Sequence, residues 1–114
     1  MEIVQPRLLP PARGGPSLDD DIAAILIPEQ QLKARVAELG RQLAAEYRGK
    51  RPVLVGVLRG CVFFLADLMR FMDIELEIDF MAISSYSGKS ALGVVRVLKD
   101  LDTSLEDRHV LLVE

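Results

Sequence analysis

The chain has 114 residues, of which 50% are apolar and 27% are charged, with a formal net charge of −3 at pH 7. This is the composition of an ordinary globular domain, and the negative charge argues against non-specific nucleic-acid binding through a basic surface while leaving room for a local cationic pocket. The single cysteine, Cys61, excludes a disulfide within the chain and favours a cytoplasmic setting, and no apolar run is long enough for a signal peptide or a membrane span.

The N-terminal residues 1–21 are predicted to be a flexible tail. Prolines recur through residues 1–18 and are joined by a pair of adjacent glycines, a composition that disfavours both a helix and a central strand. An acidic run, 19–21, closes the tail. Residues 22–114 are then interpreted as one core domain that is incomplete at its C-terminus.

The core begins with an apolar segment and a long helix. IAAILI at 22–27 has the composition of a short strand. Pro28 suits the first position of a helix, Glu29 complements the positive end of its dipole, and Gly49 suits the residue after its end. Between them apolar residues recur at steps of three and four: Leu32, Val36, Leu39, Leu43 and Tyr47. This stripe predicts a helix face that packs in the core, and not a cofactor site.

The remainder of the chain predicts strands around one buried helix. The expected strands are apolar throughout or alternate between apolar and polar residues, and they cover 52–58, 75–83, 93–101 and 109–114. The expected helix, 61–72, is polar only at Asp67 and Arg70. Residues 84–93 indicate a serine- and glycine-rich loop, and 103–108 a polar turn. This order of elements indicates an α/β domain with a parallel core.

Ligands of open α/β sheets bind beyond the carboxyl ends of the strands, where three segments of this chain carry unusual residues. The first is VLRGC, 57–61, between a strand and a helix. Free backbone N–H groups at a helix start favour an anion, Gly60 allows a ligand to approach the backbone, and Arg59 adds a charge suited to phosphate. Taken alone, this pattern is more often plain turn chemistry.

The second segment, SSYSGKS at 84–90, is typical of a mobile lid, with Tyr86 offering a ring and a hydroxyl. An exposed hairpin connection is the simpler interpretation of the same residues. The third is Glu114, at the end of the final strand, where a carboxylate can hold sugar hydroxyls or a hydrated Mg²⁺. A solvated terminal side chain would give the same pattern.

Four segments carry a family resemblance when they are taken together: VLVGVLRGCVFFLADLMR, EIDFMAISSYSG, GVVRVLKDLD and HVLLVE. In order and spacing, from about Ile25 to Glu114, they resemble the bacterial hypoxanthine (hypoxanthine-guanine) phosphoribosyltransferases. The resemblance implies a type I phosphoribosyltransferase fold, a Rossmann-like parallel-core sheet flanked by helices. It also implies purine salvage, in which phosphoribosyl pyrophosphate and hypoxanthine or guanine give IMP or GMP and pyrophosphate.

The same resemblance implies roles for individual residues. In the family, the turn matched by Leu58, Arg59 and Gly60 binds pyrophosphate and contains a non-proline cis peptide, with a lysine more usual at the position of Arg59. Ser85 and Tyr86 match the catalytic lid loop that covers the site when both substrates are bound.

Glu114 matches the first of two adjacent acidic residues that hold the ribose hydroxyls, directly or through the Mg²⁺ cofactor. The family's second acid, general-base aspartate, 5′-phosphate loop and base-reading residues have no counterpart in the 114 residues. We therefore expect this chain alone to be inactive and its last strand, 109–114, to expose apolar surface that invites pairing with another chain. The full-length protein is expected to be a homo-oligomer, either a dimer or a tetramer.

Other functions stay open beside this one. The chain also suits a phosphoribosyltransferase with another base preference, such as xanthine or guanine, a non-catalytic nucleotide-binding regulator, or a remnant fragment completed by a partner. The serine-tyrosine lid favours catalysis, since a regulator has no need to exclude water. The remaining polar candidates are assigned to the surface (His109), to packing (Cys61), and to structural or solvated positions (Asp67, Asp79 and Asp100).

Overall fold

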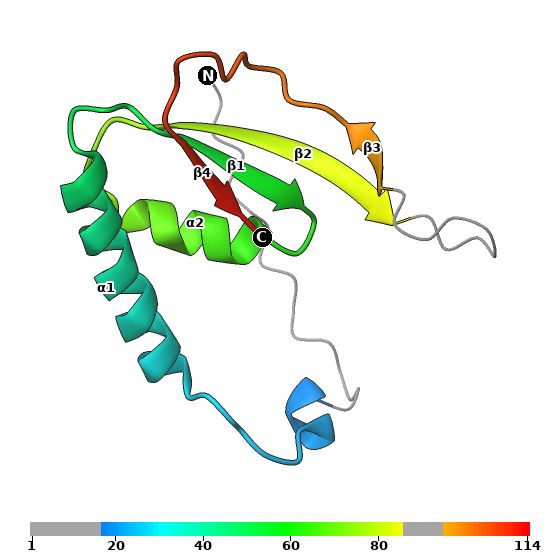
Figure 1. The fold of residues 1–114 in the computed structure, drawn as a ribbon. Coiled ribbons are helices and arrows are strands. Elements are labelled where there is room, and N and C mark those ends of the chain that lie inside the picture. The colour runs from blue at the N-terminus through cyan, green and yellow to red at the C-terminus, as the bar shows by residue number, and fades with distance from the viewer. Residues whose placement is uncertain (1–16, 86–94) are drawn as a thin grey trace, which may run out of the picture.

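The computed structural model describes residues 17–85 and 95–114, which fold around a four-stranded sheet (Figure 1). The elements in chain order are the short 3-10 helix η1 (Leu18–Asp21), α1 (Glu29–Tyr47), β1 (Val53–Leu58), α2 (Val62–Arg70), β2 (Glu77–Ser85), β3 (Val95–Lys99) and β4 (Val110–Val113). The strand order is β3-β2-β1-β4, with β1 parallel to β2 and β4 and with β3 antiparallel to β2 at one edge. The predicted α/β architecture with a parallel core is confirmed, and it carries one antiparallel edge strand.

One hydrophobic cluster joins the two helices to the sheet. Its buried members come from both helices, from β1 and β4 and from the segments that flank α2: Val36, Ala44, Leu54, Cys61, Leu65, Leu68, Met72 and Val113. Helix α2 packs against β1, and α1 packs against α2. Strand β1 is the most deeply buried, because it lies between two parallel neighbours, and its unbroken apolar run follows from that position.

Helix α1 confirms the predicted helix, but its buried face differs from the predicted stripe. Pro28 is its N-cap and not its first residue, and Leu32, at the start of the stripe, is 55% exposed. Leu39 and Leu43 of the stripe pack against the core as predicted, and the most deeply buried residues beside Val36 are small: Ala37, Gly40 and Ala44. A Cβ at Gly40 would lie 2.6 Å from the Cβ of Phe71 and 3.1 Å from the carbonyl oxygen of Leu68. The close approach of α1 to the end of α2 therefore requires a residue without a side chain.

The prediction of a strand at 22–27 is wrong. These residues form an irregular segment whose side chains are exposed, with Leu26 at 91%. An apolar run becomes a strand only where a sheet edge offers backbone partners, and the sheet of the described residues does not include this segment. Just before it, η1 is capped by the Ser17 hydroxyl, which accepts the N–H of Asp19. Residues 1–16 of the predicted tail lie outside the described residues.

Two of the predicted strands differ from the observed ones in detail. Strand β2 continues through Ser84 and Ser85, which the sequence places in a loop, because both residues pair with β3. Backbone pairing extends this strand beyond its apolar run. Strand β4, Val110–Val113, is shorter than the predicted strand 109–114 and exposes apolar surface as expected: only Val113 is buried, whereas Leu112 is 64% exposed. Val113 packs in the core cluster with the two helices, whereas Leu112 points to the opposite face of the strand, which is left uncovered.

Candidate functional site

The turn after β1 and the end of β4 meet at the carboxyl edge of the sheet. Strand β1 ends at Leu58, and Gly56 pairs with Val113 of β4, so that Glu114 follows directly beyond this pair. Because the two strands are parallel neighbours, Glu114 and the turn 58–60 lie at the same edge (Figure 1). The structure thus brings together two of the three segments that the sequence singles out.

The turn has an unusual backbone. The Leu58-Arg59 peptide bond is cis, as the family resemblance implies for this turn. Arg59 and Gly60 are exposed, and no heavy atom lies within 4 Å of a Cβ built on Gly60. The space above Gly60 is therefore open to a ligand. The N–H of Val62 donates to the carbonyl of Arg59 at 3.2 Å and leads the chain into α2.

Arg59 provides a cation at this turn. Among the described residues its guanidinium forms no salt bridge, whereas Arg70 of α2 pairs with Asp67 at 2.9 Å. The N-cap of α2, Cys61, makes no side-chain hydrogen bond to the first turn of the helix. Backbone N–H groups at the helix start thus have no side-chain acceptor from their cap. A guanidinium beside such a helix start is suited to bind a phosphate group.

Gly56 shapes the site, although the sequence interpretation missed it. A Cβ at Gly56 would lie 2.8 Å from Cys61 Sγ and 3.0 Å from both Leu65 Cδ2 and Phe80 Cδ1. Cys61 is 1% exposed and fills this space from the far end of the turn, which confirms its assignment to packing. The signal that was available is a glycine inside an apolar strand, which often marks a close approach.

The expected lid residues are described only in part. Ser85 is the last residue of β2, and Tyr86 lies outside the described residues. Leu58 is the last residue of β1 and pairs with Ala82 of β2. In the described part of the chain, the residues of β2 after Ala82 pair only with β3. The β2–β3 hairpin therefore extends beyond the carboxyl edge at which the turn lies.

The other polar candidates take structural or exposed places. Asp67 is exposed and forms its ion pair within α2, and Asp100 is exposed, with Oδ1 accepting the N–H of the next residue at 2.8 Å. His109 is exposed, and its backbone carbonyl accepts the N–H of Val53 at 2.8 Å. Asp79 is 5% exposed, and both of its carboxylate oxygens accept backbone hydrogen bonds. The assignment of these residues to structural or exposed positions is confirmed.

Within residues 17–85 and 95–114, no group of three or more His, Cys, Asp or Glu side chains is placed to hold a metal ion. Glu114 is a single carboxylate at the carboxyl edge. Mg²⁺ is commonly held by one or two carboxylates together with the phosphates of a substrate, and a single carboxylate at this edge fits that chemistry. The same residues contain no helix that is both long and apolar enough to cross a membrane.

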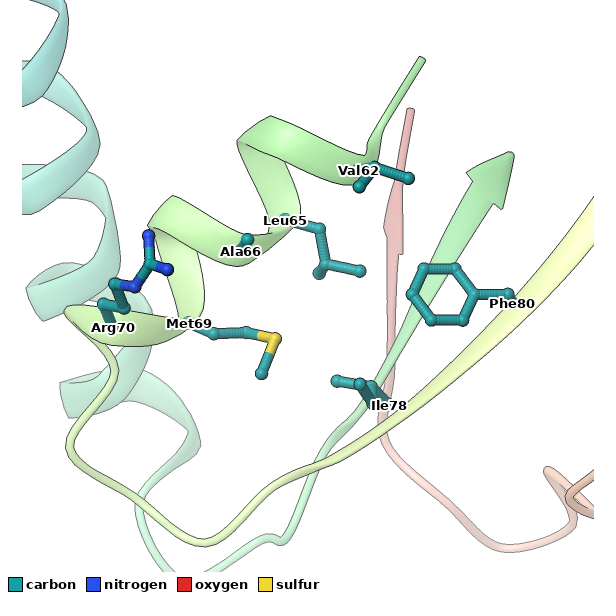
Figure 2. Close-up of a pocket in the computed structure, with 7 residues that line it drawn as sticks. All are labelled: Val62, Leu65, Ala66, Met69, Arg70, Ile78 and Phe80. Carbon is teal, nitrogen blue, oxygen red and sulfur yellow. The ribbon is translucent and has the colours of Figure 1, made fainter. Parts of the chain in front are cut away.

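Two cavities of the described structure lie beside the helices. The first, about 380 Å³, is the groove between α2 and β2 in Figure 2, lined by Val62, Leu65, Ala66, Met69, Arg70, Ile78 and Phe80. The second, about 590 Å³, lies between α1 and α2 and reaches Gly60. Neither is lined by Arg59 or Glu114, and the first is almost entirely apolar. The candidate phosphate site is therefore the open carboxyl edge, which the second cavity adjoins at Gly60.

This combination of sheet and turn has a counterpart among known protein families. The family model of the phosphoribosyl transferase domain matches residues 23–114. The chain belongs to this family. The turn at 58–60 and Glu114 both lie within the matched part of this phosphoribosyl transferase domain.

Curated relatives of this phosphoribosyl transferase domain include longer proteins. The hypoxanthine-guanine phosphoribosyltransferase of Streptococcus mutans is 46% identical over 98 residues, which are 85% of this chain and 54% of that protein. The bifunctional protein TilS/HprT of Listeria innocua is 46% identical over 102 residues, which are 89% of this chain and 16% of that protein. The chain thus spans about half the length of the hypoxanthine-guanine phosphoribosyltransferases that it matches.

Solved structures of this family share the fold. A hypoxanthine phosphoribosyltransferase from Staphylococcus aureus has a TM-score of 0.78 at 38% identity, covering 87% of this chain and 54% of that chain. A hypoxanthine-guanine phosphoribosyltransferase from Bacillus anthracis has a TM-score of 0.73 at 36% identity, covering 80% of this chain and 54% of that chain. The resemblance to bacterial hypoxanthine phosphoribosyltransferases and the type I phosphoribosyltransferase fold are thereby confirmed.

Proposed function

We propose that this phosphoribosyl transferase domain serves purine salvage, in the transfer of a phosphoribosyl group from phosphoribosyl pyrophosphate to N9 of hypoxanthine or guanine. The products are IMP or GMP and pyrophosphate. The observation that carries the proposal is the turn 58–60, where an exposed guanidinium, the open space above Gly60 and the start of α2 meet. Identity of 46% with a hypoxanthine-guanine phosphoribosyltransferase supports the choice of bases.

In this proposal the turn receives the departing pyrophosphate. As the bond between the sugar carbon C1′ and the pyrophosphate oxygen breaks, negative charge grows on the leaving group and positive charge grows on the sugar. Arg59 donates to the phosphate oxygens, and the backbone N–H groups at Gly60 and at the start of α2 add further donors. Donors that are already in place lower the barrier because they need no reorganisation while the charge develops.

Glu114 is assigned to the ribose hydroxyls, directly or through Mg²⁺, and Ser85 and Tyr86 are assigned to the lid. When bound, Mg²⁺ supplies charge that offsets the negative charge of the pyrophosphate. The carboxylate of Glu114 orients the sugar, and the lid excludes water that would otherwise hydrolyse the cationic sugar.

The proposal assigns the 114-residue chain only part of the residues that the complete reaction needs. No residue of this sequence matches the family's general-base aspartate, 5′-phosphate loop or base-reading positions, so we expect the isolated chain not to form IMP. Its expected ligands are phosphoribosyl pyrophosphate and pyrophosphate. A homo-oligomeric, Mg²⁺-dependent enzyme of the cytoplasm, with hypoxanthine or guanine as acceptor, is the expected context of the complete reaction.

Calorimetric titration of the chain with inorganic pyrophosphate and Mg²⁺ tests the role of the turn. We expect saturable binding that Arg59→Ala weakens by about tenfold or more, since a hydrogen bond to a charged group contributes roughly 1.5–3 kcal/mol. Arg35→Ala is the matched control because Arg35 is also exposed and pairs with Glu38 on α1 at 2.7 Å; this variant should bind as tightly as the unmodified chain. Equal affinities for the Arg59→Ala variant and the unmodified chain would contradict the proposal.

A further inference from the structure

We infer that Asp79 is a positioning residue for the ribose-binding side of the site: its carboxylate holds the β3–β4 connection, residues 100–109, and through it the strand that presents Glu114. The inference rests on the proposed function only for the role of Glu114. The contact between Asp79 and the connection is a set of hydrogen bonds observed in the structure and does not depend on the proposed function.

The carboxylate of Asp79 is hydrogen bonded on both oxygens. Oδ1 accepts the N–H of Phe80 at 2.7 Å, and Oδ2 accepts the N–H of Asp102 at 3.0 Å and that of Thr103 at 2.9 Å. The residue is among the buried ones, although its side chain is charged. Such a group is a strong anchor, because its removal leaves three backbone N–H groups without this partly buried acceptor.

Asp79 reaches the connection on the face of the sheet opposite α2. Its neighbours Ile78 and Phe80 line the groove against α2 (Figure 2), and side chains alternate along a strand, so that Asp79 points the other way. The connection starts at β3, on one edge of the sheet, and ends at β4, on the other edge (Figure 1). It must pass the two inner strands on the way, and Asp79 holds it where it passes β2.

Lys99 strengthens this tie at the start of the connection. Its Nζ donates to the carbonyl oxygens of Phe80 and Asp100, at 2.9 Å each, and lies 3.2 Å from Oδ2 of Asp102. The end of β3 and the first residues of the connection are therefore fastened to β2 beside Asp79.

A second carboxylate of β2 holds the other end of the connection. Glu77 forms an ion pair with Arg108 at 2.8 Å, and Arg108 donates a hydrogen bond to the backbone carbonyl of Arg51 at 3.1 Å. At the next residue, the carbonyl of His109 accepts the N–H of Val53, where β4 begins to pair with β1. The path into β4 is thus set by contacts from β2 at both ends of the connection.

Strand β4 depends on these ties because it has a paired strand on one side only. Among the described strands it pairs with β1 alone, and its Leu112 side chain is largely exposed. Without Asp79 the connection would lose its anchor at Asp102 and Thr103 and keep only the ties of Lys99 and Arg108, so that β4 would hold Glu114 less firmly. The turn at Arg59 would keep its position, because the packing of Cys61 holds it independently.

Hydrogen exchange of backbone amides, followed by NMR on the whole chain, tests the first step. In Asp79→Asn the charge and one acceptor oxygen are lost, and we expect the amides of β4 to exchange about tenfold faster while those of α2 change by less than about twofold. Asp100→Asn is the matched control, since this carboxylate lies in the same connection but is exposed, and it should leave β4 unchanged. Unchanged exchange in β4 of Asp79→Asn would overturn the inference.

A second variant, which keeps the carboxylate, is needed in case Asp79→Asn does not fold. If circular dichroism shows that Asp79→Asn is unfolded, Lys99→Met gives the same comparison, because it removes the tie of Lys99 Nζ and leaves Asp79 in place. We expect about threefold faster exchange in β4 of Lys99→Met, and no change there would overturn the inference.

Paired titrations test the link to the site. In Asp79→Asn the affinity for phosphoribosyl pyrophosphate with Mg²⁺ should fall about fivefold, while that for inorganic pyrophosphate should change by less than about twofold. Combining Asp79→Asn with Glu114→Gln should weaken binding of phosphoribosyl pyrophosphate no further than Glu114→Gln alone. Full additivity would show that Asp79 acts by general destabilisation and would overturn the inference. If the unmodified chain binds no phosphoribosyl pyrophosphate, the proposed function fails. The hydrogen-exchange comparison still tests whether Asp79 holds the connection and β4 in place.

Discussion

At the scale of single residues, the turn at the carboxyl edge is fixed by the packing of Cys61 against Gly56 in the core. Cys61 occupies the space that a Cβ at Gly56 would need, and such a Cβ would lie only 2.8 Å from Sγ. A larger residue at this position would push Cys61, and with it the turn that carries Arg59, outward. The direction of the candidate phosphate-binding cation is therefore decided by residues inside the core.

Gly56→Ala tests this packing. We expect it to lower the free energy of unfolding by about 1–3 kcal/mol, the usual cost of adding a methyl group to a filled core, as measured by urea denaturation. Gly60→Ala is the control, because no heavy atom lies within 4 Å of the added Cβ; its free energy of unfolding should change by less than about 0.5 kcal/mol. Equal stabilities for the two variants would contradict the close packing at Gly56.

Asp79 should make the stability of the chain depend on pH. The N–H of Thr103, with those of Phe80 and Asp102 and the charge of Lys99, outweighs burial and holds the pKa of the Asp79 carboxyl below its ordinary value. A carboxyl with a lowered pKa stabilises the fold above its unfolded pKa, about 3.9, and this contribution is lost as the pH falls further. We therefore expect the urea midpoint to drop in acid, and to drop less in Asp79→Asn. A drop of equal size in both chains would show that this carboxyl is not involved.

At the scale of elements, the approach of α1 to α2 depends on small side chains. Gly40 lies so close to the end of α2 that a Cβ would meet Phe71 at 2.6 Å and the Leu68 carbonyl oxygen at 3.1 Å. Alanine is the better helix former by about 1 kcal/mol, so helix propensity and packing predict opposite effects of a substitution here.

We expect packing to prevail in Gly40→Ala, with a free energy of unfolding lower by about 1–3 kcal/mol, because the nearest atoms are a Cβ and a backbone oxygen that cannot rotate away. Gln42→Ala, at an exposed position of the same helix, should change stability by less than about 0.5 kcal/mol. Thermal and urea unfolding of both variants measure the difference. A stabilised Gly40→Ala would mean that the helices are not in close contact at this point.

Helix α1 was predictable from the helical spacing of its apolar residues and β1 from its unbroken apolar run, because both patterns reflect burial. The segment 22–27 was not, because an apolar run does not say which strand it pairs with. The small buried residues of α1 also escaped prediction, since glycine and alanine add little to an apolar stripe. At the site, the charge of Arg59 is visible in the chain, whereas the partners of Asp79, 23 and 24 residues away in sequence, emerge only when β2 and the connection meet.

At the scale of the whole molecule, both edges of the described sheet expose apolar side chains. Val97 and Leu98 on β3 are 52% and 61% exposed, and Leu112 on β4 is exposed to a similar degree. An edge strand offers unpaired backbone groups as well, so a second chain can add to it and bury this surface.

We therefore expect the chain to self-associate as its concentration rises, which sedimentation velocity measures. Leu112→Lys places a charge on the exposed face of β4 and should shift the distribution toward the monomer. Leu26→Lys is the control, because Leu26 is an even more exposed leucine that lies outside the sheet, and it should leave the distribution unchanged. A chain that stays monomeric throughout, or equal effects of the two variants, would argue against association through β4.

The central claim is that the turn after β1 and the end of β4 form one edge that binds phosphoribosyl pyrophosphate. Backbone amide chemical shifts, followed by NMR while phosphoribosyl pyrophosphate and Mg²⁺ are added, test it most directly. We expect the largest changes at Gly60, Cys61 and Glu114, with little change at Ala66 and Ile78 in the groove between α2 and β2. Changes confined to the groove, or none at the turn at saturating ligand, would contradict the assignment of this edge.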